Sequence, residues 1–174
     1  MSAPTIRLLT PSDAVVYRAL RLRSMQEYPD AFTSSYEEDL YRTTAWAEQR
    51  LTPDVQRPHD FFMGAFCDGV LSGVVGLNGR YRLKERHNAT VVGMAVATAS
   101  QGQGLGRKLM QALLAHAHTL PGLVQLDLTV TEGNAPAQHL YENLGFQVVG
   151  VHPRAICVDG RYHAKVHMVL SLTR

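Results

Sequence analysis

A glycine-rich turn between a buried strand and an amphipathic helix is the feature that most constrains how this chain folds. The sequence predicts the strand over residues 89–97 (ATVVGMAVA), the turn over 101–106 (QGQGLG) and a helix from there to about Leu120. The N-terminus of a helix carries unpaired N–H groups and a partial positive charge, which suit a phosphate. The three glycines allow the backbone to come close to such a ligand. The segment therefore predicts a phosphate site, with a purely structural turn as the alternative.

Two well-known phosphate loops do not match this turn. A Walker A loop requires Gly-Lys-Ser/Thr, whereas Gly106 is followed by Arg107. The dinucleotide fingerprint requires glycine at position 107 and an acid at the end of the next strand, but position 107 is arginine and Asp127 lies inside the predicted strand. The pattern that fits is Gln/Arg-x-x-Gly-x-Gly/Ala, at Gln101, Gly104 and Gly106. A dinucleotide-dependent enzyme is therefore disfavoured.

The rest of the chain alternates predicted strands and helices. An Asp-Gly pair at 68–69 separates two apolar runs and predicts a β-hairpin. The expected strands are 4–9, 61–67, 70–77, 89–97, 123–130, 146–151 and 162–171, and the expected helices run from Ser12–Asp13 to Tyr28, over 36–51, from the glycine-rich turn to 120, and from Asn134 to Gly145. The order β-α-α-β-β-β-α-β-α-β-β predicts a single α/β domain, residues 1–174, around a mixed sheet.

Composition and charge argue against several classes of protein. The chain has 17 basic and 15 acidic residues, a net charge of +2 and no basic block, so no nucleic acid is expected as a partner. No apolar run approaches the roughly 18 residues of a membrane span. An acid within residues 1–13 argues against a signal peptide, which predicts a cytoplasmic protein. His163 and His167 would lie about 13 Å apart in a strand, too far to share a metal ion, and no metal is expected.

Two motifs together resemble the GNAT superfamily of N-acetyltransferases. The first, Gln101-x-x-Gly104-x-Gly106, is similar to the pyrophosphate loop of that family. The second runs from Asn134 to Phe146 (NAPAQHLYENLGF) and resembles the family's N-x-x-A-x-x-L-Y-x-x-x-G-F helix. The resemblance implies a mostly antiparallel central sheet flanked by helices, acetyl-CoA as co-substrate, and transfer of an acetyl group to an amine.

The same resemblance implies roles for individual residues. Backbone groups of Met94, Ala95 and Val96 would bind the pantetheine arm and the acetyl carbonyl, with a preorganised N–H as oxyanion donor. Asn134 caps its helix and would also hydrogen-bond the cofactor. The pyrophosphate would lie on the amides of the loop that Gln101 opens, which are those of Gly102, Gln103, Gly104, Leu105, Gly106 and Arg107.

Tyr141 is the expected general acid. It shares a helical stripe with Ala137, Leu140 and Leu144, and this spacing alone favours a tyrosine buried in the core. Its place in the second motif implies instead that its phenol, with an ordinary pKa near 10, protonates the departing thiolate, whose acid has a pKa near 8.5.

The general base is the part of the site that the motifs leave open. Thr90 and Thr129 occupy the two positions at which members of the family carry a glutamate, and neither can take a proton from an ammonium group. Removal of the proton through water is one alternative. The other is one of four titratable residues, each of which also suits a solvated surface: Asp127, Glu85, His87 and Glu132.

An acetyl-CoA-dependent N-acetyltransferase is the leading hypothesis, and a non-catalytic acyl-CoA-binding or regulatory module of the same fold is the alternative. The acceptor would be a primary amine in a small molecule or a peptide, with amino acid, peptide N-terminus, polyamine and drug all open. Glu37, Glu38 and Asp39 could steer a cationic amine, or could match the dipole of a helix N-terminus. Both a monomer and a homodimer stay open.

Overall fold

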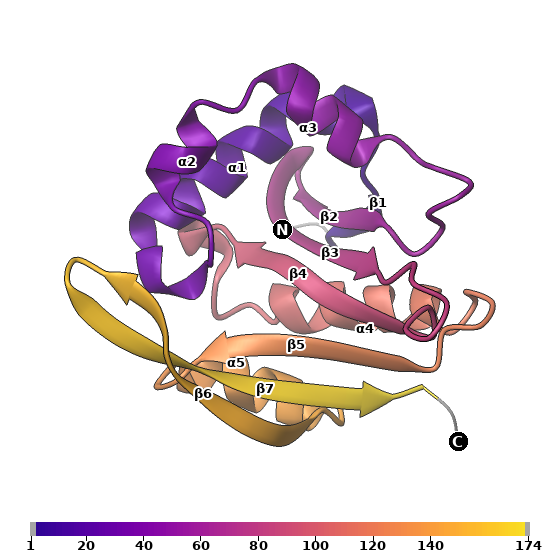
Figure 1. Ribbon diagram of the computed structural model, residues 1–174. Coiled ribbons are helices and arrows are strands. Elements are labelled where there is room, and N and C mark those ends of the chain that lie inside the picture. Colours follow the sequence, from indigo (N-terminus) through magenta and orange to yellow (C-terminus); the bar gives the residue numbers. More distant parts are fainter. Residues whose placement is uncertain (1–2, 173–174) are drawn as a thin grey trace.

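One seven-stranded sheet organises the protein, with its strands in the order β1-β2-β3-β4-β5-β7-β6 (Figure 1). The computed structural model describes residues 3–172. Within them, neighbouring strands are antiparallel apart from the parallel pair β4 and β5, which confirms the predicted mixed, mostly antiparallel sheet. The strands are β1 (Thr5–Leu8), β2 (Phe61–Cys67), β3 (Val70–Gly79), β4 (Asn88–Val96), β5 (Gln125–Thr131), β6 (Gln147–Val158) and β7 (Arg161–Ser171).

Helices flank the sheet in the predicted order, with one correction. The helix expected over 36–51 is two helices, because Ser35 caps the first and Thr43 caps the second. Thr43 has the extended backbone of an N-cap, and its hydroxyl accepts a hydrogen bond from the Trp46 amide at 3.2 Å. The helices are α1 (Ala14–Glu27), α2 (Tyr36–Leu40), α3 (Thr44–Leu51), α4 (Leu105–Ala117) and α5 (Ala135–Asn143), with 3-10 turns η1 (Pro11–Asp13), η2 (Pro29–Ala31) and η3 (Thr98–Ser100). No helix within residues 3–172 has the length and apolar character needed to cross a membrane.

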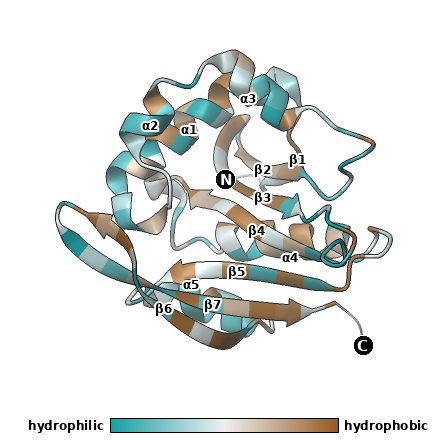
Figure 2. Ribbon diagram, in the orientation of Figure 1, coloured by the Kyte–Doolittle hydropathy of each residue, from teal (hydrophilic) through white to brown (hydrophobic). Residues whose placement is uncertain are grey.

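Two clusters of buried side chains lie on opposite faces of the sheet. One joins α4 and Tyr141 of α5 to the strands, and the other joins α1 and α3 to them. Because successive side chains of a strand point to opposite faces, Met63 belongs to the first cluster and its neighbour Phe62 to the second. Figure 2 shows hydrophobic segments along β3 and β4, whereas β5, β6, β7 and the helices carry both kinds of residue. The sheet is thus covered on both sides, as the α/β prediction requires.

The parallel pair β4 and β5 separates part-way along the sheet. Pairing extends only over Asn88–Thr90 of β4 and 125–127 of β5. Further along, Gly76 of β3 pairs with Val92 and Val74 pairs with Ala95, so β4 holds one extra residue, a β-bulge that includes Gly93 with φ of +61°. The strands therefore diverge where β4 approaches the glycine-rich turn, and space opens between them.

Two Asp-Gly turns close the β2–β3 and β6–β7 hairpins. Asp68 and Gly69 have φ of +47° and +81°, which confirms the predicted turn between β2 and β3. Asp159 and Gly160 have φ of +48° and +76° and join β6 to β7 in the same way. The prediction ended this strand at about residue 151, but β6 continues to Val158, and Pro153 lies at an irregularity of this edge strand, where the missing N–H is tolerated.

Candidate active site

A groove of about 630 Å³ runs along the glycine-rich turn, between the end of β4, the start of α4 and helix α5. We call it the outer groove. Gln103, one of the predicted loop residues, does not line it, and its side-chain amide donates a hydrogen bond to the Ala99 carbonyl at 3.2 Å. The predicted residues that do line it are Met94, Ala95, Val96, Gln101, Gly102, Gly104, Leu105, Gly106, Arg107 and Asn134.

Two glycines in the left-handed region shape the turn. Gly102 and Gly104 both have φ of +73°, and Gly104 is the N-cap of α4. A Cβ at either position would meet no other atom within 4 Å, so the backbone angle rather than crowding requires glycine here. The first N–H groups of the 13-residue helix α4 have no partner within the helix. This end of the groove therefore suits a phosphate.

Gly106 and Gln101 fix the turn to the sheet. A Cβ at Gly106 would lie 3.0 Å from the Met94 Cε atom, so glycine lets the first turn of α4 pack closely against β4. The side-chain amide of Gln101 donates to the Val96 carbonyl at 3.1 Å and to the Tyr28 hydroxyl at 3.3 Å. The turn is thereby tied to β4 and to the end of α1.

A second cavity, of about 390 Å³, lies where β4 and β5 diverge, and we call it the inner cavity. The two spaces share part of their walls, so they adjoin: Ala31, Phe32, Met94, Asn134 and Ala137 line both. A ligand in the outer groove and a second one in the inner cavity would therefore meet beside the bulge of β4.

Tyr141 lines the inner cavity and not the outer groove, and it lies one turn of α5 after Ala137, which lines both. It is buried, and its ring meets Phe146 edge-on with centroids 6.0 Å apart. Within residues 3–172 its hydroxyl has no hydrogen-bond partner. Burial raises the pKa of Tyr141 to about 12, so the phenol stays protonated at neutral pH. Tyr141 is therefore buried in the core, as its helical spacing predicts, and it also lines the inner cavity.

The two threonines that replace the expected glutamates, Thr90 and Thr129, both line the inner cavity. Asp127 stands behind Thr90, accepts its hydroxyl hydrogen bond at 2.7 Å, and forms an ion pair with Arg80 at 2.5 Å. None of the four titratable candidates for the base lines the inner cavity, and no other Asp or Glu of residues 3–172 does.

Sequence reasoning missed Lys165, which lines the inner cavity from β7. It is 5% exposed, and its Nζ donates to the Thr131 hydroxyl at 2.7 Å and to the Asp30 carbonyl at 3.4 Å. Burial lowers the pKa of Lys165, and the Asp30 carboxylate opposes that shift. A lysine between the apolar residues of a predicted strand was the available signal.

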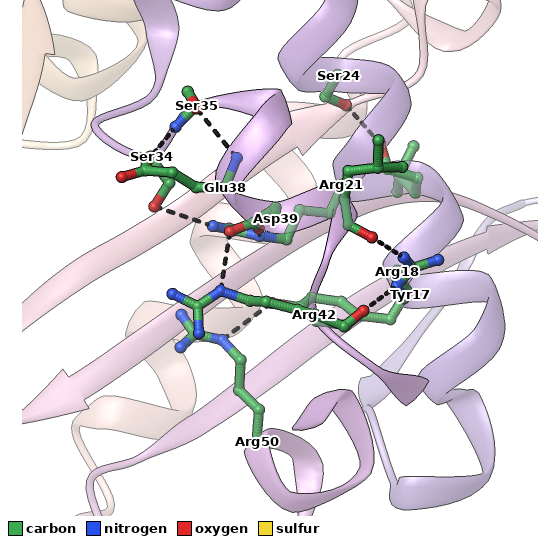
Figure 3. Close-up of polar contacts among 12 residues, drawn as sticks. Tyr17, Arg18, Arg21, Ser24, Ser34, Ser35, Glu38, Asp39, Arg42 and Arg50 are labelled. Carbon is green, nitrogen blue, oxygen red and sulfur yellow. Dashed lines mark hydrogen bonds and ion pairs between the residues drawn. The ribbon is translucent and has the colours of Figure 1, made fainter. Parts of the chain in front are cut away.

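The acids expected to steer a cationic amine are engaged elsewhere. Glu38 accepts a hydrogen bond from the Ser35 amide at 2.9 Å and so completes the cap of α2. Asp39 is buried, and Figure 3 shows Arg21 and Arg42 converging on its carboxylate. Neither these two nor Glu37 lines the inner cavity, so their positions do not support a steering role there.

Comparison with known proteins decides the family. The model of the acetyltransferase (GNAT) family matches residues 22–146. The chain belongs to the GNAT acetyltransferases. It is 34% identical over 117 residues to N-alpha-acetyltransferase RimI of Mycobacterium tuberculosis, a match that covers 66% of this chain and 70% of that protein. The family resemblance drawn from the two motifs is therefore confirmed.

Solved GNAT structures share the whole architecture. A GNAT acetyltransferase from Streptococcus pneumoniae superposes with a TM-score of 0.88 at 24% identity and covers 97% of this chain and 99% of its own. The putative acetyltransferase yncA from Salmonella typhimurium, solved with its cofactor acetyl-CoA, has a TM-score of 0.80 at 24% identity, over 99% of this chain and 96% of its own. These likenesses confirm the predicted fold.

Proposed function

We propose that this GNAT protein moves the acetyl group of acetyl-CoA to a primary amine, with Tyr141 as general acid. The observation that carries the proposal is the position of Tyr141. Its phenol has no protein partner in the described part of the chain, it lines the inner cavity, and Ala137, one helical turn earlier in α5, lines both that cavity and the outer groove. A cofactor in the groove and an amine in the cavity would both lie within reach of this hydroxyl.

The residues of the outer groove fit acetyl-CoA. The amides of 102–107 present unpaired N–H groups to a pyrophosphate at the start of α4. Asn134 uses its side-chain oxygen to cap α5, accepting from the Ala137 amide at 3.3 Å, so its NH₂ group is free to donate to a ligand. When bound, acetyl-CoA supplies an activated acyl group as a thioester.

The bulge in β4 offers the oxyanion donor. Gly93 and Met94 have no partner residue in β3, and the pairing of β4 with β5 ends at Thr90. Backbone N–H groups at this point are therefore released from the sheet ladder while the flanking strand holds them in place. A donor fixed in this way stabilises the negative charge that develops on the acetyl oxygen.

The proton balance assigns the task of Tyr141. A C–N bond replaces the C–S bond, one proton leaves the amine, and one proton reaches the sulfur. A phenol with pKa about 12 is a weak acid against a thiol with an ordinary pKa near 8.5. The same surroundings, which contain little water, also raise the pKa of the thiol, so the difference between the two pKa values becomes smaller. Tyr141 therefore keeps its proton at neutral pH until it donates that proton to the departing sulfur.

We propose that the amine proton leaves to water, or that the protein captures the neutral fraction of the acceptor. This follows from the walls of the inner cavity, because no Asp or Glu of residues 3–172 lines it. Burial lowers the pKa of Lys165, which also lines the cavity, but its Nζ already donates to the Thr131 hydroxyl and to the Asp30 carbonyl.

The test is Tyr141→Phe, which removes one hydroxyl and almost no volume. We expect kcat to fall by about 10²-fold or more, while the affinity for acetyl-CoA barely changes. Because the hydroxyl has no partner among the described residues, the free energy of unfolding should stay within about 0.5 kcal/mol of wild type.

A loss of about 1 kcal/mol in stability with normal turnover would return Tyr141 to a purely structural role. Acetyl-CoA binding by the wild-type chain, without release of thiol in the presence of any amine, would instead support the non-catalytic module.

A further inference from the structure

The inner cavity has an unusual charge for a site that receives an amine. Its charged side chains are Arg21, Arg50 and Lys165, and within residues 3–172 no carboxylate lines it. An acceptor with positive charge alone would meet repulsion from all three cations and no compensating partner. Binding becomes favourable if the acceptor also carries negative charge, because buried cations then gain partners.

Arg21 is held in place so that one edge of its guanidinium is left free. Its Nε pairs with the buried carboxylate of Asp39, and its Nη2 donates weakly to the Ser34 hydroxyl at 3.4 Å (Figure 3). Its Nη1 points to the bulge of β4, since a Cβ built on Gly93 would lie 3.8 Å away. The Arg21 side chain is only 11% exposed. Its Nη1 donor is therefore held beside Gly93, in the wall of the inner cavity.

Arg50 is oriented by a hydrogen bond and by two aromatic rings. Its Nε donates to the Tyr17 hydroxyl at 3.0 Å, and its guanidinium lies 4.7 Å from the centre of the Phe62 ring and 5.4 Å from that of Trp46. Neither Nη group has a hydrogen-bond partner in the described residues. Two parallel N–H donors on a fixed guanidinium match the two oxygens of a carboxylate.

Nearby acids do not cancel this charge. Asp39 is shared between Arg21 and Arg42, which binds it at 3.1 Å from the exposed side, so one carboxylate faces two guanidinium groups. Arg50 and Lys165 remain without a carboxylate at salt-bridge distance among residues 3–172. The Asp30 carboxylate acts on Lys165 from outside the cavity, but the wall itself carries cationic side chains and no carboxylate among residues 3–172.

We propose that the acceptor is a small amine that carries a carboxylate within a few bonds of its reacting nitrogen, as a free α-amino acid does, and that Arg50 and Arg21 bind this carboxylate. The proposal rests on the proposed acetyl transfer. The short separation follows from the bulge, because Gly93, beside Nη1 of Arg21, directly precedes Met94 at the junction with the outer groove. A volume of about 390 Å³ is also that of a small-molecule site.

The same cations bear on the missing base. Arg21, Arg50 and Lys165 raise the free energy of an ammonium group in the cavity, which favours the neutral amine that can attack a thioester. A carboxylate at Thr90 or Thr129 would oppose this effect and would compete with the acceptor for the arginines. The threonines are thus consistent with an anionic acceptor.

Matched sets of acceptors test the proposal. Each set contains an α-amino acid, its carboxamide and its decarboxylated amine, and the panel adds spermidine and a tripeptide with a free N-terminus. Thiol release by the full chain with acetyl-CoA gives kcat/KM for each compound. We expect the best amino acid to exceed its carboxamide and its amine by about 10²-fold, because they lose the paired charge-assisted hydrogen bonds.

Two variants then link the preference to the site. In Arg50→Gln the ratio of kcat/KM between amino acid and carboxamide should fall to within a few-fold of one. In Arg42→Gln, which changes an exposed arginine of the same cluster that does not line the cavity, the ratio should stay at the wild-type value. A thermal shift with acetyl-CoA confirms that each variant is folded.

Binding measured without turnover separates the proposal of an anionic acceptor from the proposal of acetyl transfer. With CoA present, amino acids should raise the melting temperature of the wild type and not of Arg50→Gln. Turnover that prefers the carboxamide, the tripeptide or spermidine would overturn the anionic acceptor and leave the acetyl transfer standing. Binding of amino acids without turnover of any amine would overturn the acetyl transfer and support the arginine site. Neither binding nor turnover would overturn both.

Discussion

The outer groove and the inner cavity adjoin, yet they are built from different parts of the chain in different ways. The groove takes its binding groups chiefly from two contiguous stretches, 94–107 and 134–143, and the groups that matter are backbone amides and glycine conformations. The inner cavity draws charged side chains from α1, α3 and β7, which lie far apart in the sequence. A cofactor common to a family suits a local backbone motif, whereas an individual acceptor is recognised by side chains.

The largest effect should come from a change in the backbone of the outer groove. Gly104→Val forces a β-branched residue to a φ of +73° at the N-cap of α4. Acetyl-CoA at a hundred times its dissociation constant should stabilise the wild type by about 2.7 kcal/mol. We expect this thermal shift to vanish in the variant.

Gly122→Val is the matched control, because Gly122 has φ of +74°, is equally uncrowded, and lies away from the outer groove. It should suffer similar backbone strain and keep the shift. A normal shift in Gly104→Val would mean that the cofactor does not bind at this turn.

Asp13→Asn tests an ion pair that lies away from both spaces, between β1 and the start of α1. The Arg7 guanidinium lowers the pKa of Asp13 to about 2, from an ordinary value of 3.8. The folded state then binds fewer protons than the unfolded state, so this stabilisation is complete above about pH 4 and is lost as the pH falls to 2. We expect the variant to be less stable by about 2 kcal/mol at pH 7 and equal to wild type near pH 2 in denaturant titrations. A difference that does not change with pH would assign the effect to packing.

Tyr17→Phe tests the inner cavity separately from the outer groove. It removes the hydroxyl that orients Arg50 and leaves the guanidinium and its aromatic contacts in place. We expect the KM for the preferred acceptor to rise by about fivefold, or about 1 kcal/mol, because the Arg50 guanidinium loses one of the contacts that orient it. The dissociation constant of acetyl-CoA should not change, and an effect on acetyl-CoA alone would show that the two spaces are not separate in function.

The smallest effect is expected where a general base would act. At low acceptor concentration the rate should rise roughly tenfold per pH unit towards the pKa of the amine, since only the neutral fraction reacts. Alanine at Asp127, Glu85, His87 or Glu132, and methionine at Lys165, should each leave this slope unchanged. A plateau that starts near pH 6–7 and is lost in one of these variants would identify that residue as the base.

Local sequence was sufficient for the strand–turn–helix at 89–106 and for the helix at Asn134, because glycine conformations, helix caps and alternation act over a few residues. It was insufficient where two signals competed. The helix expected over 36–51 divides because Thr43 caps a new helix, and β6 extends past Pro153 because an edge strand tolerates it. Thr43 acts as an N-cap inside the predicted helix, and Pro153 is accommodated inside an edge strand, and the sequence pattern indicated neither.

The composition of the inner cavity depends on the fold and not on any stretch of sequence. Arg21 and Arg50 are ordinary helical arginines in the sequence, and Lys165 is an isolated charge in a strand. They become one cationic wall because α1 and α3 pack on the sheet beside the point where β4 and β5 diverge. The glycine-rich turn could be predicted from the sequence because its atoms are neighbours along the chain, whereas the cationic wall of the inner cavity joins side chains whose proximity arises only from packing and strand order.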